Sequence, residues 1–467
     1  MRIKWVGYFF IGFLAFLLIR TTFIAIVMHR EYFTAATEQR TTLIPASTAP
    51  RGIIYDRNFF PLTAERAPHT IGYVRGGTGM GLQKIFDNYL KIDDLSFLLT
   101  AGLAVETAAN GTPIAPTATL FRSASTRKGV HLTLDYRIQE IVQDALSARG
   151  DSGGAAVVID AETGDILAMS STPVYSPEDI AASLGSSGGE FVNRAIAAYD
   201  VGSLFKIVTT SAAVEEGVAT PESRYNCVGF TSVSEHVFHC NNRAGHGELT
   251  LAEAFSLSCN IPFFEIGTEL FGKGKNLYNY ASKFGFGERL LDVEMDEAAG
   301  NSVRSKSMAE IANTAIGQGD FQATPLQIAA MIGTVVNGGK RVPLRLVSGL
   351  IGDDGVTETP YSEPRGEVRA IKPKTAETIK SMMLEAVQSG TGKNAMIEGV
   401  DVGGKTASAE TGWLGDDGTT MTHGWFGGFF RHKNTMYVCV VLAEDGKTGS
   451  GSAVPIFSEI GRGITSM

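Results

Sequence analysis

The feature that most constrains this chain is an apolar run near its N-terminus. Residues 5–19 read WVGYFFIGFLAFLLI without a charge, and after Arg20-Thr21-Thr22 residues 23–28 are apolar again. A helix that spans a bilayer needs about 20 apolar residues, and flanking basic side chains can reach the interface. We expect one uncleaved membrane anchor, because the small-residue site Thr34-Ala35-Ala36, where a signal peptidase could cut, lies well beyond the apolar core.

The rest of the chain has the composition of a large globular protein. Of its 467 residues, 44% are hydrophobic and 19% are charged, and the formal net charge is -9. This acidic balance offers no basic stripe for phosphates, which argues against a nucleic-acid partner. We expect residues 1–30 to form a short tail and the transmembrane anchor, 31–130 a small, irregular pedestal or dimerisation-like domain, and 131–467 the main domain.

Strand patterns lie at both ends of the main domain. Residues 155–159 (AAVVI) and 166–169 (ILAM) predict a β-hairpin, and residues 425–430 and 435–443 are again strand-like. Helical patterns lie between these clusters, one of them beginning at Thr324-Pro325, where Thr suits the N-cap and Pro the first turn. The pattern predicts an α+β domain whose first and last segments pair in one antiparallel sheet flanked by helices.

Ser203-Leu204-Phe205-Lys206 opens an apolar helical run and is the first candidate for chemistry. Residues three apart share a face of a helix, so the Lys206 amine would lie beside the Ser203 hydroxyl. A lysine neutralised by burial can take the proton of the serine, and the helix N-terminus favours the negative charge that develops. The same spacing recurs at Ser125-Thr126-Arg127-Lys128, but that polar stretch gives its lysine no reason to lose a proton.

Two further motifs would complete a site. In Ser258-Cys259-Asn260 a hydroxyl and an amide can both face a cleft, although Asn260 could instead cap a helical turn. A Lys-Thr pair occurs at Lys374, at Lys405 and, as a literal Lys-Thr-Gly triplet, at Lys447. We choose Lys405-Thr406-Ala407-Ser408, because two strands that could neighbour its own follow it, whereas Lys447 lies past the last of them.

The three motifs in this order resemble those of penicillin-binding proteins. Their flanks are similar to class B members, the membrane-anchored peptidoglycan D,D-transpeptidases: Arg51-Gly52-Ile53-Ile54-Tyr55-Asp56-Arg57-Asn58 looks like the opening signature, and Ser389-Gly390-Thr391-Gly392 also matches. Three features depart from the family pattern. Val201 replaces a Pro, Ala407-Ser408 replaces Gly-Thr, and the segment between the membrane and the transpeptidase domain is short for the family. No glycosyltransferase domain could fit in that segment.

The resemblance implies a serine acyltransferase that cross-links stem peptides and is inhibited by β-lactams. Ser203 would attack the penultimate D-alanyl carbonyl of a stem peptide, with Lys206 as the general base. Ser258 would pass a proton to the leaving amine, and Asn260 would hold the peptide amide. Backbone N-H groups of Ser203 and Ser408 would form the oxyanion hole.

The strand motif has an electrostatic and binding role in the family. Lys405 would supply positive potential, and the hydroxyls of Thr406 and Ser408 would bind the substrate carboxylate. Ala407 stands between them, so we expect a functional but slightly displaced site. A D,D-carboxypeptidase or β-lactamase-like hydrolase, and a β-lactam-binding sensor or inactive scaffold, are the alternative readings.

The location of peptidoglycan implies a single-pass protein of the cell membrane whose catalytic domain is extracytoplasmic. The implied partner is a RodA/FtsW-like membrane glycosyltransferase, which would polymerise the glycan. We expect no cofactor and no metal, because His236, His239 and His246 lie near one another without a supporting carboxylate or cysteine spacing. Cys227 and Cys240 bracket a short stretch, and either a disulfide or two separate buried thiols would fit.

Overall fold

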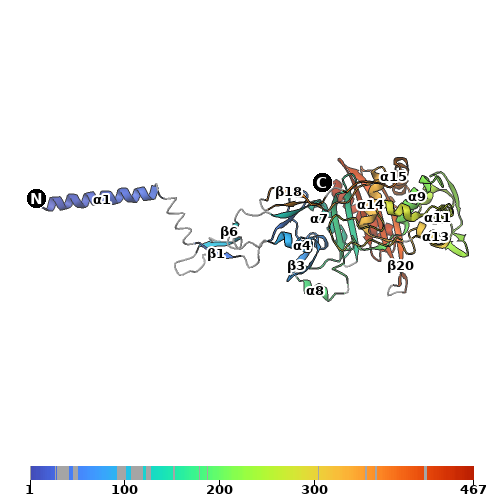
Figure 1. Ribbon diagram of the computed structural model, residues 1–467, viewed down its shortest axis with the longest axis horizontal. Coiled ribbons are helices and arrows are strands. Elements are labelled where there is room, and N and C mark those ends of the chain that lie inside the picture. The colour runs from blue at the N-terminus through green and yellow to red at the C-terminus, as the bar shows by residue number, and fades with distance from the viewer. Residues whose placement is uncertain are drawn as a thin grey trace. The chain divides into compact units, whose positions relative to one another are not determined.

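The computed structural model (Figure 1) divides into two compact units. One unit comprises Met1–Gly52 and Lys91–Arg127, and the other comprises Ile53–Leu90 and Lys128–Met467. The structure describes residues 2–26, 28, 41–45, 51–91, 101–106, 119–122, 128–150, 153–177, 179–186, 188–302, 304–352, 355–362, 365–414 and 418–467. The small-residue site at 34–36 and the decoy serine at 125 lie outside these residues.

The first unit contains the apolar helix and a small sheet. Within the described residues, α1 (Arg2–Ile26) is the one helix long and apolar enough to cross a membrane, with a mean hydropathy of 2.3 over Trp5–Ile26. Thr21 and Thr22 do not break it, because their hydroxyls donate to the carbonyls one turn back, at 2.7 and 2.8 Å. The predicted single apolar helix is confirmed. The small sheet has the order β1 (Thr41–Pro45), β5 (Ala101–Glu106), β6 (Thr119–Arg122).

The centre of the second unit is a five-stranded antiparallel sheet. β22 pairs with β8 along its length, and Val440 lies opposite Val157. The predicted α+β class, with early and late segments paired in one sheet, is therefore confirmed. In spatial order the strands are β20 (Val402–Leu414), β21 (Thr420–His432), β22 (Thr435–Ala443), β8 (Gly154–Asp160) and β9 (Ile166–Thr172).

Side chains of the central strands alternate between two hydrophobic cores. Val438, Val440 and Leu442 belong to one core, whereas Cys439 and Val441 belong to the other. Successive residues of a strand point to opposite faces of the sheet. An unbroken apolar strand such as TMYVCVVLA therefore requires a sheet that is covered on both faces.

Helices cover both faces (Figure 1). α7 (Tyr136–Ser147) and α16 (Gly449–Thr465) pack on one face. The other face carries α14 (Pro325–Val336) with α9 (Lys206–Glu215), α11 (Ile261–Gly272) and α15 (Pro373–Gln388). α14 begins as the sequence predicts: the Thr324 hydroxyl accepts from the N-H of Gln327 at 3.0 Å, and the Gln327 side chain accepts from the N-H of Thr324 at 2.9 Å.

The remaining elements of the second unit are short. The helices are α3 (Pro68–Ile71), α4 (Gly81–Ile85), α5 (Asp87–Leu90), α8 (Ile180–Leu184), η2 (Gly202–Phe205), α10 (Leu251–Ser256), α12 (Leu277–Phe284), α13 (Met308–Ala315) and η3 (Lys393–Ala395). One small sheet has the order β18 (Glu358–Pro360), β17 (Val347–Ile351), β7 (Gly129–Leu132), β2 (Ile53–Tyr55). The paired strands are β3 (Tyr73–Arg75) with β4 (Thr78–Met80), β10 (Tyr199–Asp200) with β15 (Gln322–Ala323), β11 (Arg224–Cys227) with β14 (Gly247–Thr250), β12 (Phe230–Val233) with β13 (His236–His239), and β16 (Lys340–Arg341) with β19 (Val368–Arg369).

Asp56 explains why the segment Ile53–Leu90 belongs to the unit that carries the catalytic motifs. Its buried carboxylate accepts from the backbone N-H groups of Asn58 at 2.8 Å and Phe60 at 2.7 Å. It also accepts from the N-H of Tyr136, in the first turn of α7, at 3.1 Å. The opening signature is thus a structural joint between an early segment and the main domain. The predicted domain boundary at residue 130 stays a prediction.

Asp56→Ala should lower the free energy of unfolding by about 3 kcal/mol, because a buried donor that loses its acceptor costs about 1–3 kcal/mol and three donors lose theirs. Denaturant unfolding of the full-length protein in detergent measures the change. Asp144→Ala, at an exposed position of α7, is the matched control and should stay within about 0.5 kcal/mol of the parent protein. Equal stability of the two variants would show that Asp56 is not a structural joint.

Candidate active site

The nucleophile candidate Ser203 lies in a tight turn at the start of α9. The sequence predicts an α-helix from Ser203, but the turn is the 3-10 helix η2, and α9 begins at Lys206. Side chains three apart eclipse one another in a 3-10 helix, so Ser203 and Lys206 share a face. Gly202 enters the turn with φ at +56°, and its N-H donates to the carbonyl of Gly317 at 3.0 Å. These glycines fix where the serine emerges.

Lys206 is fully buried, and its amine is held by the Ser258–Asn260 segment. Nζ donates to the carbonyl of Ser258 at 2.8 Å, to the carbonyl of Cys259 at 3.1 Å and to Oδ1 of Asn260 at 2.8 Å. It also lies 3.4 Å from Oγ of Ser258. Burial lowers the pKa of the Lys206 ammonium to about 7. At neutral pH the amine therefore has a substantial neutral population, as a general base requires.

Lys405 reaches the same serine from the sheet. It is fully buried on β20, and Nζ donates to Oγ of Ser258 at 2.9 Å and to the carbonyl of Thr406 at 3.0 Å. Burial, with a smaller effect of the neighbouring Lys206 charge, holds the pKa of Lys405 well below its usual value. Two amines from different elements thus converge on the hydroxyl of Ser258.

The Ser258–Asn260 segment is a connection and not a regular element. It joins α10 to α11, and Ser258 adopts φ of +57°, a left-handed conformation that is uncommon outside glycine. Asn260 stands at the start of α11 but makes no side-chain cap. Its Nδ2 instead donates to the carbonyl of His239 at 3.3 Å. The capping alternative for Asn260 is therefore wrong, and Lys206 and His239 hold the side chain at the cleft.

These groups open into a cleft of about 860 Å³. Its lining includes every predicted site residue except the two buried lysines: Ser203, Ser258, Asn260, Thr406, Ala407 and Ser408. Carboxylates that line it are limited, among the described residues, to the exposed Glu410. The structure therefore brings all eight predicted residues to one place.

Ala407 and Ser408 keep the expected strand geometry. Ala407 lies on the same face of β20 as Lys405 and is 3% exposed, within the larger hydrophobic core. Ser408 is exposed, and its Oγ accepts from the N-H of Gly449 at 3.3 Å. The carbonyl of Ser408 lies against Gly202, where an added Cβ would come within 3.0 Å of it. The strand and the nucleophile turn are therefore in close contact.

Sequence reasoning missed several residues of the cleft wall. Thr391 contacts Thr406 through their hydroxyl oxygens at 2.6 Å, and it lies in the Ser389–Gly392 motif that the sequence had flagged without a role. Gln318, which the sequence predicts to lie in a structural turn next to the cleft, lines the cleft between two glycines in left-handed conformations. Lys447 lines it as well, from the loop that precedes α16. Lys374, in contrast, lies in the first turn of α15 and away from the cleft.

A second cluster of reactive side chains lies beside the Ser258–Asn260 segment. The thiols of Cys227, Cys240 and Cys259 and the imidazole of His246 all lie within 4.8 Å of one another. The four cysteines of the chain are free thiols and buried, so the structure shows no Cys227–Cys240 disulfide. The sequence had suggested no cysteine spacing for a metal; the folded chain brings together ligands that the sequence separates.

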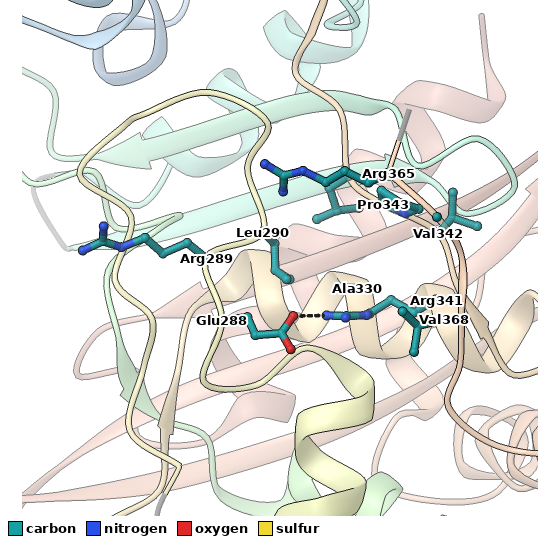
Figure 2. A pocket seen from close by; sticks show the side chains of 11 residues that line it. Glu288, Arg289, Leu290, Ala330, Arg341, Val342, Pro343, Arg365 and Val368 are labelled. Atoms are coloured by element: carbon teal, nitrogen blue, oxygen red, sulfur yellow. Dashed lines mark hydrogen bonds and ion pairs between the residues drawn. The ribbon is translucent and has the colours of Figure 1, made fainter. Parts of the chain in front are cut away.

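A further pocket, of about 190 Å³, lies apart from these motifs (Figure 2). Figure 2 shows Glu288 and Arg341 facing one another across it, and their side chains form an ion pair at 2.9 Å. Arg289 and Arg365 extend away from that pair. None of its lining residues belongs to the catalytic cleft.

The site combines Ser203 with the buried Lys206 one turn away, and a second serine and a strand lysine lie beside them. This is a serine acyl-transfer site of the penicillin-binding type. The sequence model of the penicillin binding protein transpeptidase domain matches residues 154–462, more than half of the chain. The chain belongs to this family.

The relatives agree with the class B resemblance. The chain is 34% identical to penicillin-binding protein PbpB of Mycolicibacterium smegmatis, over 71% of this chain and 53% of that protein. It is 32% identical to peptidoglycan D,D-transpeptidase PbpA of the same organism, over 70% of each. The chain thus spans about half the length of the first relative. The structure of penicillin binding protein 3 from Mycobacterium tuberculosis in complex with ampicillin is similar, with a TM-score of 0.71, 26% identity, and coverage of 90% of this chain and 94% of that one.

Lys405→Ala should slow acylation by a fluorescent penicillin at least about 100-fold, because a buried positive group is removed from the site of developing charge. Lys447→Ala should slow it less than about fivefold, since Lys447 is exposed and water and salt screen its charge. Stopped-flow acylation of both full-length variants measures the difference. A larger loss in the Lys447 variant would show that the strand motif is misplaced.

Proposed function

We propose that this chain is a peptidoglycan D,D-transpeptidase that forms an acyl-enzyme on Ser203. The observation that carries the proposal is the convergence of two buried amines, Lys206 and Lys405, on the Ser258 hydroxyl inside the cleft that Ser203 lines. This arrangement can move a proton between the two amines and the hydroxyl. Family membership and the relative named a D,D-transpeptidase support the choice of substrate.

In the first half-reaction, the neutral amine of Lys206 takes the proton of Ser203 as Oγ attacks the D-alanyl carbonyl. The C-N bond then breaks, and D-alanine leaves with a proton delivered through Ser258. Lys405 faces Ser258 and favours negative charge at the substrate carboxylate, which Thr406 and Ser408 would bind. Backbone N-H groups of Ser203 and Ser408 would stabilise the oxyanion, typically by a few kcal/mol.

In the second half-reaction, an amine from another stem peptide attacks the ester carbonyl, loses its proton to the relay and frees Ser203. Hydrolysis instead of transfer would make the enzyme a carboxypeptidase or β-lactamase. A hydrolase needs a group that activates water. Among the described residues that line the cleft, Glu410 is the one carboxylate, and it is exposed on β20, whereas Ser258 and Lys206 are buried. Product analysis with an acceptor amine distinguishes the two: a cross-linked dimer supports transfer.

We further propose that α1 anchors the protein as a single span and that the catalytic unit lies on the outer side of the membrane. The support is the length and hydropathy of α1 together with the extracytoplasmic location of peptidoglycan. The resemblance to class B penicillin-binding proteins supports a RodA/FtsW-like membrane glycosyltransferase as the proposed partner that supplies glycan strands.

Ser203 should carry the covalent penicillin adduct, because it combines exposure to the cleft with a neutral lysine one turn away. Peptide mapping by mass spectrometry after penicillin labelling of the full-length protein identifies the site. Ser203→Ala should give no adduct, and Lys206→Ala should lower the acylation rate by about 10²–10⁴-fold, the usual loss when a general base is removed. An adduct on Ser258, or none on the parent protein, would overturn the assignment.

An exported form without residues 1–30 should still be acylated by penicillin, because the chemistry resides in the second unit. In cells it should fail to replace the full-length protein, since it has lost its position beside the membrane-bound glycosyltransferase. Complementation of a depletion strain, with labelling by fluorescent penicillin to show that the truncated protein is folded, measures this. Full complementation by the truncated form would remove the need for membrane proximity.

A further inference from the structure

Three separate segments bring the cysteine and histidine cluster together. β11 pairs with β14 so that Cys227 lies opposite Gly247, and the N-H of His246 donates to the carbonyl of Cys227 at 3.0 Å. Cys240 directly follows β13, and its N-H donates to the carbonyl of Gly229 at 2.9 Å. Cys259 comes from the connection between α10 and α11. Two strand pairs, β11 with β14 and β12 with β13, and a helix junction therefore fix the positions of the four side chains.

The distances within the cluster are those of a tetrahedral metal site. Zn²⁺ bonds to sulfur at about 2.3 Å and to imidazole nitrogen at about 2.0–2.1 Å, which places tetrahedral ligands about 3.8 Å apart for two sulfurs and about 3.6 Å apart for sulfur and nitrogen. Sγ of Cys240 lies 3.8 Å from Sγ of Cys259. Nδ1 of His246 lies 3.5 Å from both Sγ of Cys227 and Sγ of Cys240. Three edges therefore match without any movement.

The sulfurs of the cluster are shielded from solvent. The three cysteines are at most 1% exposed. Burial of a thiolate without a partner of opposite charge is costly, so thiolates in this place require a cation. A metal ion among the four side chains would supply that positive charge.

We propose that Cys227, Cys240, His246 and Cys259 bind one Zn²⁺ ion in a closed structural site. Three soft sulfur ligands and one imidazole are a set that favours zinc over magnesium or calcium, which prefer oxygen. All four positions are filled by protein side chains, so the ion has no place for water or substrate. A disulfide would join two of the three thiols and would not account for the third thiol and the imidazole. The sulfur atoms of Cys240 and Cys259 are also farther apart than the roughly 2.05 Å of an S-S bond.

The site is connected directly to the catalytic machinery. Cys259 stands between Ser258 and Asn260, and its carbonyl accepts from the Lys206 amine at 3.1 Å. Asn260 also donates to the carbonyl of His239, the residue before Cys240. An ion bound to the sulfurs of Cys240 and Cys259 therefore holds the hairpin against the segment that keeps Ser258 in its left-handed conformation. We assign these ligands a positioning role and no part in the chemical steps.

Metal analysis of the full-length protein, purified in detergent without a polyhistidine tag, tests the site independently of transpeptidation. We expect about one zinc per chain in the parent protein and less than about a tenth of that in Cys227→Ser/Cys240→Ser. Cys439→Ser is the matched control, because Cys439 is buried in β22 outside the cluster and should leave the zinc content unchanged. His246→Asn should lose metal, whereas His239→Asn, at an exposed position of β13, should retain it.

Exchange of the parent protein with Co²⁺ gives a second readout that needs no variant. Tetrahedral cobalt with thiolate ligands should show intense visible bands and sulfur-to-metal charge transfer. The proposal is overturned if the parent protein binds neither zinc nor cobalt stoichiometrically. Peptide mapping that finds a disulfide among the three cysteines would also overturn it, as would equal zinc contents in the cluster and control variants.

The positioning role has its own test. Removal of zinc with a chelator should slow penicillin acylation roughly tenfold or more, the order found when groups around a metal site are lost. Added Zn²⁺ should restore the rate, and added Mg²⁺ should not. Stoichiometric zinc with an unchanged acylation rate would leave the site in place and overturn its positioning role. Failure of acylation in the zinc-loaded parent protein would instead count against the proposed transpeptidase function.

Discussion

The burial of two amines around one hydroxyl is the constraint on which this active site depends. Lys206 and Lys405 both donate to Ser258, and neither has access to solvent. Two like charges that share one hydrogen-bond partner repel by roughly 3 kcal/mol at an effective dielectric constant of about 20, and desolvation adds to this cost. The site therefore favours a state with at least one neutral amine. Such an amine next to a serine hydroxyl is what proton abstraction requires.

The architecture makes this burial affordable in free energy because each amine comes from a rigid element. Lys405 extends from β20, where it lies opposite Gly427 of β21 in the central sheet. Lys206 begins α9, whose side chains are almost all buried. The Ser258–Asn260 segment is the exception, since it is irregular and includes a left-handed serine. Contacts from the hairpin at His239 and the cysteine cluster surround this segment. The irregular part of the catalytic site is thus supported by contacts from outside it.

Much of the site could be predicted from the sequence because its information is local. The spacing of Ser203 and Lys206, and the strand pattern after Lys405, each depend on a few neighbouring residues. The cysteine cluster could not be found in this way. Its ligands are brought together by the registers of two strand pairs and by a helix junction, and no short spacing among Cys227, Cys240 and Cys259 records that convergence. The 3-10 turn at Ser203 was missed for another reason: its eclipsed geometry depends on the backbone contact of Gly202 with Gly317.

The literal Lys-Thr-Gly triplet at residues 447–449 matches the active-site strand motif for structural reasons. Thr448 is the N-cap of α16, where its hydroxyl accepts from the N-H of Gly451 at 3.2 Å. Gly449 packs on the strand motif itself, and an added Cβ would lie 2.4 Å from the carbonyl of Ala407 and 2.2 Å from that of Trp425. Glycine is therefore required at this position for close packing and threonine is suited to the cap. The triplet sits beside the catalytic strand because α16 must begin there, and its resemblance to the active-site motif follows from packing.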